Sequence, residues 1–336
     1  MIKSEGYFVE VGKIYKGINE IENVGNDEVL VKIEVCGLCR TDLHILDGEI
    51  PFTKYPIIPG HQIIGRVLQK GENVENIDVG NRVGIYWLYS SCQNCEYCRR
   101  GKENLCDKAE FTGCTVHGGF QELIVAKKDY FVKIPDFYDN YEAAPLMCAG
   151  IIGYRAFYFV KDFDSIGIYG FGSAGHIIAQ VALSLGKEVL AFIKREDKDT
   201  ANLAYNLGCK VYYSDEVIEE KHWGSIIFAP VGELVKFALQ NTKKGGIVVC
   251  GGIHMSDIPP LKYEWLWNER ILMSVANVTR KDAIDFWDLI SQIYRDKKNK
   301  IKLDLDIFKI DEFEKVIEKY RKGQTKKSVV FEMKIV

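Results

Sequence analysis

The sequence contains no run of about 18 consecutive apolar residues, which a transmembrane helix requires, so we expect no membrane partner. Its first residues, Met1–Gly6, lead into no apolar segment of the secretory type, and we expect a cytoplasmic protein. The net charge of -3 lacks the basic excess of a nucleic-acid-binding domain, so no nucleic-acid partner is expected. Internal repeats and low-complexity segments are also missing. What is present, 47% hydrophobic and 27% charged residues, is typical of a globular protein.

The length of 336 residues exceeds what one hydrophobic core usually holds, so two domains are expected. Residues 1 to about 90 contain short alternating stretches between glycines, such as Val29–Val35, which predict a β-rich domain. Further along, apolar strands alternate with helical segments, which predicts an α/β domain with a doubly wound parallel sheet. These strands are predicted at 165–169, 188–193, 225–228 and 246–250. A last strand, 328–331, is expected to return to the first domain.

Ten cysteines in a cytoplasmic protein need an explanation other than disulfides. Four of them lie close together in the sequence, at Cys92, Cys95, Cys98 and Cys106. Four thiolates can fill every position of a tetrahedral zinc, and such a closed site is structural. An iron–sulfur cluster or four free thiols are the alternatives, although the spacing differs from that of bacterial and plant ferredoxins.

A second group of metal-binding residue types lies in Cys36–His44 and Gly60–Gln62. Cysteine thiolate and neutral histidine are ligands that zinc prefers, and a catalytic zinc takes three protein ligands and keeps one position open. We expect Cys39 and His61 to be two of these ligands and Cys148 to be the third. The alternative is that Cys39 is a small core residue and His61 a hydrogen-bonded loop histidine.

A glycine fingerprint, Gly170-x-Gly172-x-x-Gly175, stands between a predicted strand and a predicted helix. In that context it is typical of a dinucleotide site, where the glycines let the backbone approach a pyrophosphate. An NAD enzyme usually has an acidic residue at the end of the next strand, whereas this chain has Lys194 and Arg195. Two cations favour the 2'-phosphate of NADP(H). The alternative is that both side chains are solvated and NAD is still accepted.

Together these motifs resemble the zinc-dependent medium-chain alcohol dehydrogenases over essentially the full length of the chain. The stretch Thr242–Arg280 resembles a propanol-preferring bacterial and archaeal branch. The resemblance implies a GroES-like β-rich catalytic domain over residues 1–148 and 278–336. It implies a Rossmann dinucleotide-binding domain over residues 149–277, and pairing of two or four copies into a homodimer or homotetramer.

The same resemblance implies two Zn2+ ions per chain and roles for individual residues. The ligands would be Cys39, His61 and Cys148 at a catalytic zinc, and Cys92, Cys95, Cys98 and Cys106 at a structural zinc. Around the catalytic zinc the implied roles are Thr41 as the hydroxyl beside the substrate oxygen, His44 as the proton-relay imidazole, Asp42 as the carboxylate orienting His61, Trp87 as an aromatic pocket wall and Arg40 near the cofactor pyrophosphate.

The implied reaction is reversible hydride transfer between a primary or secondary alcohol and NAD(P)+, giving an aldehyde or ketone. Zinc acts as a Lewis acid on the alcohol oxygen, and the proton leaves through Thr41 and His44. Gln62 departs from the family pattern, which usually has Glu beside the ligand histidine. A neutral amide leaves the site more positive by about one charge, and we hypothesise that this lowers the pKa of bound water or alcohol.

Two other functions remain open from the sequence. One is an NADPH-dependent reductase of bulkier, cinnamaldehyde-like aldehydes, which Lys194 and Arg195 would also suit. The other is a catalytically silent NADPH-binding relative. A silent relative would be expected to lack Cys39, His61 or Cys148, and all three are present.

Overall fold

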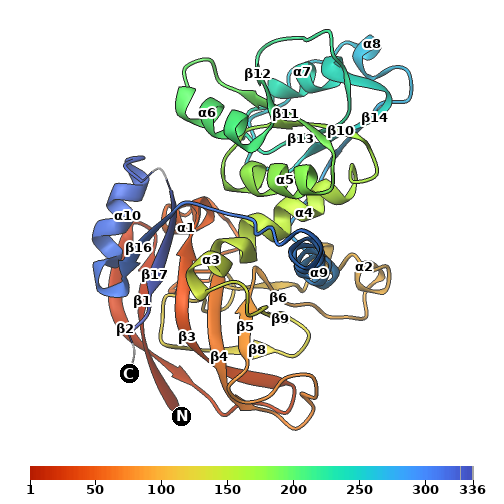
Figure 1. The fold of residues 1–336 in the computed structure, drawn as a ribbon. Helices are drawn as coiled ribbons and strands as arrows, with labels where there is room; N and C mark the ends of the chain where they lie inside the picture. The colour runs from red at the N-terminus through yellow and green to blue at the C-terminus, as the bar shows by residue number, and fades with distance from the viewer. Residues whose placement is uncertain (326, 335–336) are drawn as a thin grey trace. The chain divides into compact units, whose positions relative to one another are not determined.

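The computed structural model of the chain describes residues 1–325 and 327–334. The chain forms two compact units. The first unit comprises Met1–Cys148, Val278–Trp287 and Lys302–Val336, and the second comprises Ala149–Asn277 and Asp288–Ile301. Figure 1 shows the strands of the first unit in red to yellow and dark blue, and those of the second in yellow-green to blue-green.

The first unit is built on a seven-stranded sheet in which β3 is the most extensively paired strand. The path through the sheet is β16(Leu305–Lys309), β17(Ser328–Glu332), β3(Glu28–Leu38), β4(Gln62–Lys70), β5(Arg82–Ile85) and β9(Phe131–Lys133), with β8(Leu123–Lys127) paired to β3. A separate hairpin is formed by β1(Ile2–Glu10) and β2(Lys13–Ile21). The predicted return of the last strand is correct, because β17 pairs with β3.

The register between β3 and β4 positions the first candidate site. The two strands are antiparallel, and Gly37 near the end of β3 pairs with Gln62 at the start of β4. Cys39 follows β3 and begins α1(Arg40–Leu46), while His61 directly precedes β4. Because the end of one strand adjoins the beginning of the next, the two predicted ligands lie at the same edge of the sheet.

Cys148 reaches the same unit through a different element. The helix α3(Asn140–Pro145) is capped by Asp139, whose side chain accepts a hydrogen bond from the backbone of Glu142, while the Glu142 side chain accepts one from the Asp139 backbone. A π-helical turn, Leu146–Gly150, carries Cys148 and continues into α4(Ile151–Tyr158). Such π turns recur at functional sites.

The four clustered cysteines lie in a small lobe between β6(Leu88–Ser90) and β7(Glu110–Phe111). The lobe contains only the short helices α2(Glu96–Arg99) and η1(Glu103–Leu105). It is attached at η1, where the buried Glu103 accepts hydrogen bonds from the backbone N–H and the guanidinium of Arg280 at 3.0 and 3.3 Å. With so little apolar burial in the lobe, its shape depends on the cysteines.

The second unit is a six-stranded parallel sheet in the order β12-β11-β10-β13-β14-β15. These strands are β10(Ser165–Tyr169), β11(Glu188–Ile193), β12(Lys210–Tyr213), β13(His222–Ile227), β14(Thr242–Cys250) and β15(Ile271–Ser274). Besides α4, the helices between residues 149 and 277 are α5(Ser173–Ser184), α6(Lys198–Leu207), α7(Leu234–Asn241) and α8(Tyr263–Leu266). This strand order is that of the doubly wound dinucleotide-binding fold, as the strand–helix alternation predicts.

The last part of the chain contributes to both units. The helix α9(Arg280–Lys297) begins in the first unit, but residues 288–301, which the resemblance placed in the catalytic domain, group with the second unit. The reason is a pair of contacts with α5, where Lys297 Nζ donates to the Ser184 carbonyl and Asn299 to the Ser184 hydroxyl. A 3-10 turn, η3(Ile310–Glu312), and α10(Phe313–Arg321) then return the chain to the first unit.

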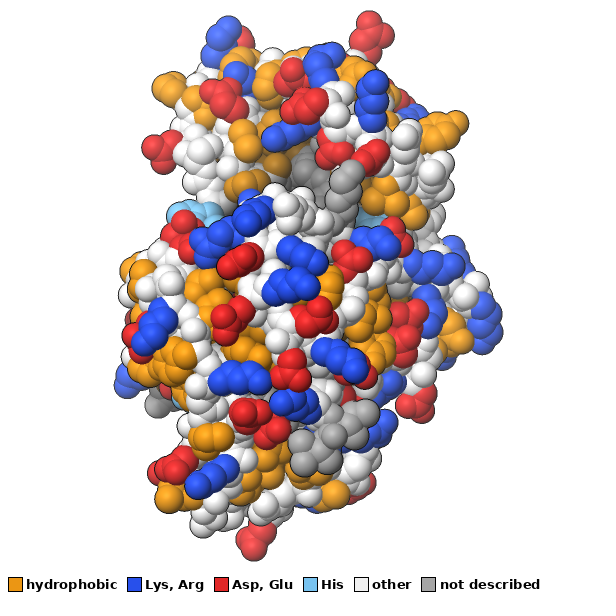
Figure 2. Space-filling view, turned by 90° about the vertical axis from the view of Figure 1, so that its left-hand side faces the viewer, with side chains coloured by type: hydrophobic (Ala, Val, Ile, Leu, Met, Phe, Trp, Pro, Cys, Tyr) orange, Lys and Arg blue, Asp and Glu red, His pale blue; other side chains and the backbone are white. Residues whose placement is uncertain are grey.

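Among the described residues, no helix is long and apolar enough to cross a bilayer. On the face shown in Figure 2, basic and acidic side chains are interspersed among apolar ones.

Candidate metal and cofactor sites

Cys39, His61 and Cys148 meet in the first unit. Their ligand atoms all lie within 4.8 Å of one another, and Cys39 Sγ is 3.1 Å from His61 Nε2. His61 is 1% exposed, so its contacts are with the protein interior. The three residues come from the end of β3, the start of β4 and the π turn, and only the folded chain brings them together.

The geometry fits a single zinc. With zinc–sulfur bonds of about 2.3 Å and zinc–nitrogen bonds of about 2.0 Å, a sulfur and a nitrogen of one tetrahedron lie roughly 3.5 Å apart. The separation of 3.1 Å between Cys39 Sγ and His61 Nε2 is close to this value. Two thiols and an imidazole are a donor set that zinc prefers, and three protein ligands leave one tetrahedral position for water or substrate.

The charges of the three groups are strongly coupled. The hydrogen bond from Cys148 and the neighbouring His61 hold the pKa of Cys39 well below its usual range. The same contact with Cys39, together with burial, raises the pKa of Cys148. Burial alone would lower the pKa of His61, but the charges of Cys39 and Asp42 raise it to about 10. The site is therefore arranged to hold a positive charge beside anionic ligands.

Asp42 joins the two ligand-bearing segments. Its Oδ2 accepts from the backbone N–H of Cys39 at 2.9 Å, and its Oδ1 accepts from the backbone N–H of Gly60 at 3.0 Å. The distance from Oδ1 to His61 Nδ1 is 3.6 Å, which is too long for a hydrogen bond. The carboxylate thus acts on His61 through its charge and through the backbone that carries the histidine.

Gln62 lies against the ligand set rather than in solvent. It is 3% exposed, and its side chain is hydrogen-bonded to the thiol of Cys148. The room for this amide is made by Gly37, where a Cβ would stand 2.2 Å from Gln62 Oε1. A neutral amide at this position can donate to a thiolate, which a carboxylate cannot do.

The other residues singled out on α1 follow the ligand Cys39 directly in the chain. The hydroxyl of Thr41 hydrogen-bonds to the sulfur of Cys39 and helps to lower its pKa. His44 contacts the carboxylate of Glu49 through Nδ1. Arg40 is exposed at the first position of the helix.

Aromatic side chains surround His61. Trp87 meets the imidazole edge-on, with ring centroids 5.0 Å apart, and stacks on Phe111 at 5.3 Å. Phe52, half-exposed, lies 5.7 Å from Phe111 and extends this surface. Burial, and then the charges of Cys39 and Asp42, raise the pKa of Tyr320 on α10.

Trp87 was singled out from the sequence, whereas Phe52, Phe111 and Tyr320 were not. Phe52 and Phe111 lie in stretches without metal-type spacing. Tyr320 is on a helix near the other end of the chain, and no local pattern links it to Cys39.

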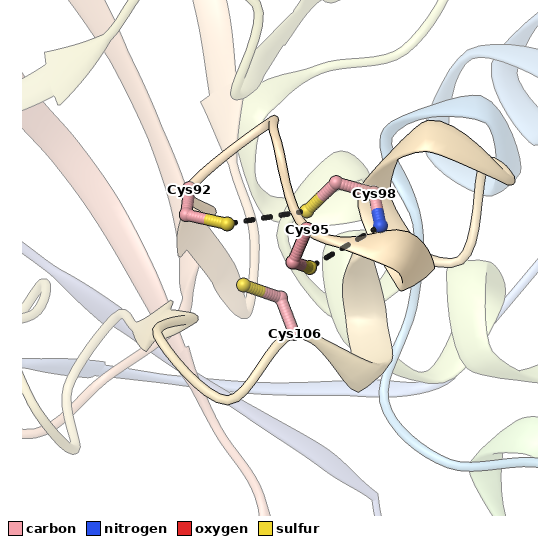
Figure 3. Close-up of side chains that lie close together, drawn as sticks. All are labelled: Cys92, Cys95, Cys98 and Cys106. Atoms are coloured by element: carbon pink, nitrogen blue, oxygen red, sulfur yellow. Dashed lines mark hydrogen bonds between the residues drawn. The ribbon is translucent and has the colours of Figure 1, made fainter.

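The four clustered cysteines form the second metal-type group (Figure 3). Cys92 Sγ and Cys98 Sγ are 3.9 Å apart, close to the roughly 3.8 Å expected between two sulfurs on one tetrahedral zinc. Backbone N–H groups also face the sulfurs, from Cys98 to Cys95 at 3.5 Å and from Lys108 to Cys106 at 3.4 Å. All four positions of a tetrahedral ion would be filled by protein.

The electrostatics of this lobe differ between Cys92, whose thiolate is favoured, and Cys106, whose thiol is favoured. Backbone N–H groups of Asn94 and Cys95 point at the sulfur of Cys92 and lower its pKa to about 6. Burial raises the pKa of Cys106 to about 11. Thiolates this close together repel one another, and a bound cation would offset that repulsion. The close spacing of the four cysteines is therefore what a metal site requires.

In the second unit the glycine fingerprint lies where the strand order reverses, after β10 and next to β13. Gly170 has a positive φ of +90°, and a Cβ there would stand 2.6 Å from the backbone nitrogen of Ala229. A Cβ at Gly175 would stand 2.3 Å from the Gly170 carbonyl. Gly172, the N-cap of α5, has open space instead, which suits the approach of a pyrophosphate to the helix N-terminus.

The two cations after β11 differ in their surroundings. The guanidinium of Arg195 lies 4.2 Å above the ring of Tyr213 and forms ion pairs with Asp215 at 3.2 Å and Glu216 at 3.8 Å. Lys194 is exposed. Tyr213 was not singled out from the sequence, because it lies beneath Arg195 only through the pairing of β11 with β12.

Comparison with known proteins identifies the family. Residues 25–136 match the alcohol dehydrogenase GroES-like domain. The chain is 38% identical over 295 residues to a probable alcohol dehydrogenase of Mycobacterium tuberculosis, covering 84% of both chains. It is 34% identical over 331 residues to an alcohol dehydrogenase of Geobacillus stearothermophilus, covering 94% of this chain and 95% of that one.

Among solved structures, acetophenone reductase from Geotrichum candidum in complex with NAD superposes with a TM-score of 0.83 at 26% identity. The match covers 98% of this chain and 97% of that one. Relatives aligned over most of their length, the two-unit fold and the Cys39–His61–Cys148 group lead to one conclusion. The chain belongs to the zinc-dependent medium-chain alcohol dehydrogenases, enzymes that transfer a hydride between an alcohol and NAD(P).

Proposed function

We propose that this enzyme interconverts primary or secondary alcohols and their aldehydes or ketones at the Cys39–His61–Cys148 site, with NADP(H) preferred. The observation that carries the proposal is a group of three zinc-type ligands, with His61 buried and the Thr41 hydroxyl against the sulfur of Cys39. Zinc bound by these residues would supply a Lewis acid for the alcohol oxygen.

The protein's own residues have distinct tasks in this scheme. Thr41 presents its hydroxyl to the site and accepts the alcohol proton as it passes on its own proton to His44, which delivers it to solvent. Asp42 holds the backbone of Cys39 and Gly60, so the ligand geometry does not depend on the substrate. Trp87 and Phe111 exclude water from one side of His61.

We assign the four-cysteine lobe a second, structural zinc. Support comes from four sulfurs that all lie within 4.8 Å of one another and from a lobe with almost no apolar core of its own. A closed set of four protein ligands has no position for substrate.

The cofactor preference rests on Lys194, Arg195 and Tyr213. A guanidinium stacked on an aromatic ring is pre-oriented to bind a phosphate through its free N–H groups. Asp215 and Glu216 oppose this, because they already pair with Arg195 and add negative charge. We therefore propose that NADP+ is favoured but that NAD+ is also accepted.

The substrate class has a second candidate. The exposed ring of Phe52 continues the Trp87–Phe111 surface, which suits a flat aromatic group. Comparing turnover of cinnamaldehyde with that of butanal separates a reductase of bulky aldehydes from an enzyme for short alcohols.

We also propose that two copies associate through β15, and that the protein works in the cytoplasm. β15 is an edge strand flanked by exposed apolar side chains, including Trp267 and Ile271. The opposite edge, β12, instead carries Lys210 in ion pairs with Glu188 and Glu220. A reducing compartment would keep the ten cysteines, all unpaired in the structure, available as thiols.

The decisive experiment combines metal analysis with oxidation of ethanol and 1-propanol by NAD+ and NADP+. Two zinc ions per chain and a higher kcat/KM with NADP+ are expected. Two zinc ions per chain with a higher kcat/KM for NAD+ would contradict the proposed NADP(H) preference but not the proposed alcohol dehydrogenase activity. One zinc and no turnover would contradict the catalytic role of Cys39, His61 and Cys148.

A further inference from the structure

The end of α1 has a backbone geometry that determines where Glu49 lies. Gly48 follows the helix with a positive φ of +73° and donates its N–H to the Ile45 carbonyl at 3.1 Å. The N–H of Glu49 donates to the His44 carbonyl at 2.9 Å. These two bonds make a Schellman motif, which brings the residue after the glycine next to the residue three positions before the helix cap. In this chain those two residues are Glu49 and His44.

The contact across this motif is usually apolar. Here the Nδ1 of His44 meets the carboxylate of Glu49. An ionised carboxylate can only accept, so the ring nitrogen facing it carries the hydrogen. The lone pair of the neutral imidazole is then on Nε2. Glu49 thereby selects the tautomer of His44.

Helix stability does not explain an acid at this position. The carbonyl end of a helix favours cations, and both Asp47 and Glu49 stand there. Asp47 is offset by an ion pair with Arg321 of α10 at 2.7 Å. Glu49 contacts the imidazole instead, so its charge acts on His44.

The exposure of the side chains rises from His61 and Asp42, through His44, to Glu49. It is 1% for both His61 and Asp42, 20% for His44 and 48% for Glu49. A proton that reaches His44 is therefore already near solvent, and Glu49 stands at the exit.

We propose that Glu49 is the positioning residue of the proton relay: it holds His44 with Nδ1 protonated and Nε2 ready to accept a proton. The inference rests on the proposed alcohol oxidation. In each turnover the alcohol loses a hydride to the oxidised cofactor and a proton to Thr41, whose own proton passes to Nε2 of His44. The imidazolium is stabilised by Glu49 until one proton leaves to water, as a carboxylate stabilises the histidine of a hydrolase triad.

The tautomer is measured directly by NMR of the imidazole nitrogens in the full-length, zinc-loaded protein. The signals of His44 are assigned among the six histidines by their loss in His44→Gln. The wild type is expected to show Nδ1–H, and Glu49→Ala a majority of Nε2–H. A wild-type His44 with its hydrogen on Nε2 would overturn the proposal. This readout needs no turnover, so it decides the point even where the proposed alcohol oxidation fails.

Kinetics test whether the position matters for the reaction. Glu49→Gln is expected to lower kcat/KM for 1-propanol by about 10- to 100-fold. The solvent deuterium isotope effect on kcat/KM should rise and the effect of deuterating the carbinol carbon should fall, because proton removal becomes slower than hydride transfer. Glu49→Asp should recover part of the loss.

The matched control is Asp47→Asn, which removes an acid from the same helix end without touching His44. Its kcat/KM and both isotope effects are expected to stay within about twofold of wild type, a change too small to involve acid–base catalysis. Equal losses in Glu49→Gln and Asp47→Asn, with unchanged isotope effects, would reduce Glu49 to a structural role and overturn the proposal.

Discussion

Two histidines are buried to the same degree in this protein, yet their surroundings shift their pKa values in opposite directions. His61 is 1% exposed and His222 is 0% exposed, and the Nδ1 of each has no hydrogen-bond partner among the described residues. The pKa of His61 is raised to about 10 by the charges of Cys39 and Asp42, which together outweigh burial.

His222 has hydroxyls and lysines around it instead. Its Nε2 meets the Ser225 hydroxyl at 2.7 Å, which in turn meets the Thr242 hydroxyl at 2.8 Å. Burial, and then the charges of Lys221 and Lys243, lower the pKa of His222 to about 3. Burial alone therefore does not make a histidine a metal ligand or a structural residue. The neighbouring charges distinguish the two cases. Anions beside His61 stabilise a positive charge at that site, whereas lysines beside His222 destabilise one.

The largest expected effect comes from removing the histidine among anions. His61→Ala removes one of the three ligands beside Cys39 and Cys148 and should lose one of two zinc ions per chain. We expect kcat/KM to fall by at least about 1000-fold, because one ligand and the metal's polarising effect are lost together. Metal analysis and steady-state kinetics measure both. His222→Asn is the matched control and should keep both zinc ions, and zinc loss from it would break the comparison.

The closed cysteine lobe should respond differently from the open site. Cys95→Ser is expected to lose the other zinc and to lower the melting temperature by several degrees, because the lobe has little core to stabilise it. The activity of the molecules that stay folded should remain within a few-fold of wild type. Calorimetry with metal analysis measures this. A large loss of kcat at unchanged melting temperature would mean that the lobe takes part in catalysis.

The pH dependence of stability sharpens the comparison at His222. Its pKa is about 3 in the folded chain and about 6.5 in the unfolded chain. Between these two pH values the unfolded chain binds a proton at this residue and the folded chain does not. Stability is therefore lost as the pH falls from about 6.5 toward 3. Between pH 7 and pH 5 the loss from this group is about 2 kcal/mol.

The measurement is urea unfolding at both pH values, in wild type and His222→Asn. The variant should lose about 2 kcal/mol less than wild type over this interval, whatever its stability at pH 7. Effects of pH on the metal sites occur in both proteins and cancel. Equal losses would show that His222 titrates normally and would remove the contrast with His61.

The smallest expected effect concerns Gln62. Gln62→Glu replaces a donor to the Cys148 sulfur by a second anion, and zinc affinity should fall about 10-fold, as it does when partners of metal ligands are changed. Competition with a chelator measures the change, with Gln69→Glu on the exposed end of β4 as control. The same variant tests the hypothesis on bound water or alcohol, since an unshifted acidic limb of kcat/KM would contradict it.

The four-cysteine lobe and the glycine fingerprint could be predicted from the sequence because the residues that mark each of them lie close together in the chain. Ligand types and spacings mark Cys92–Cys106, and a strand, three glycines and a helix mark the fingerprint from Gly170 to Gly175. The sequence also contained a local signal for the position of Glu49, because Asp47-Gly48 is typical of the end of a helix. The proton relay predicted from the sequence nevertheless included His44 and not Glu49. Tyr213 and Tyr320 had no such signal, because their partners lie on other elements.

By itself the sequence predicted the chemistry that we propose for this protein: two thiol-rich ligand sets, a phosphate-binding loop and a hydroxyl–imidazole pair at helical spacing. Apart from the distant His61 and Cys148, these depend on residue types only a few positions apart. The tertiary structure decided which groups share a charge environment. Antiparallel β3 and β4 bring Cys39 to His61, and the parallel order β12-β11-β10 brings Tyr213 to Arg195. The register of the buried strands determines these two contacts. That register depends on packing over the whole sheet rather than on any one stretch of chain.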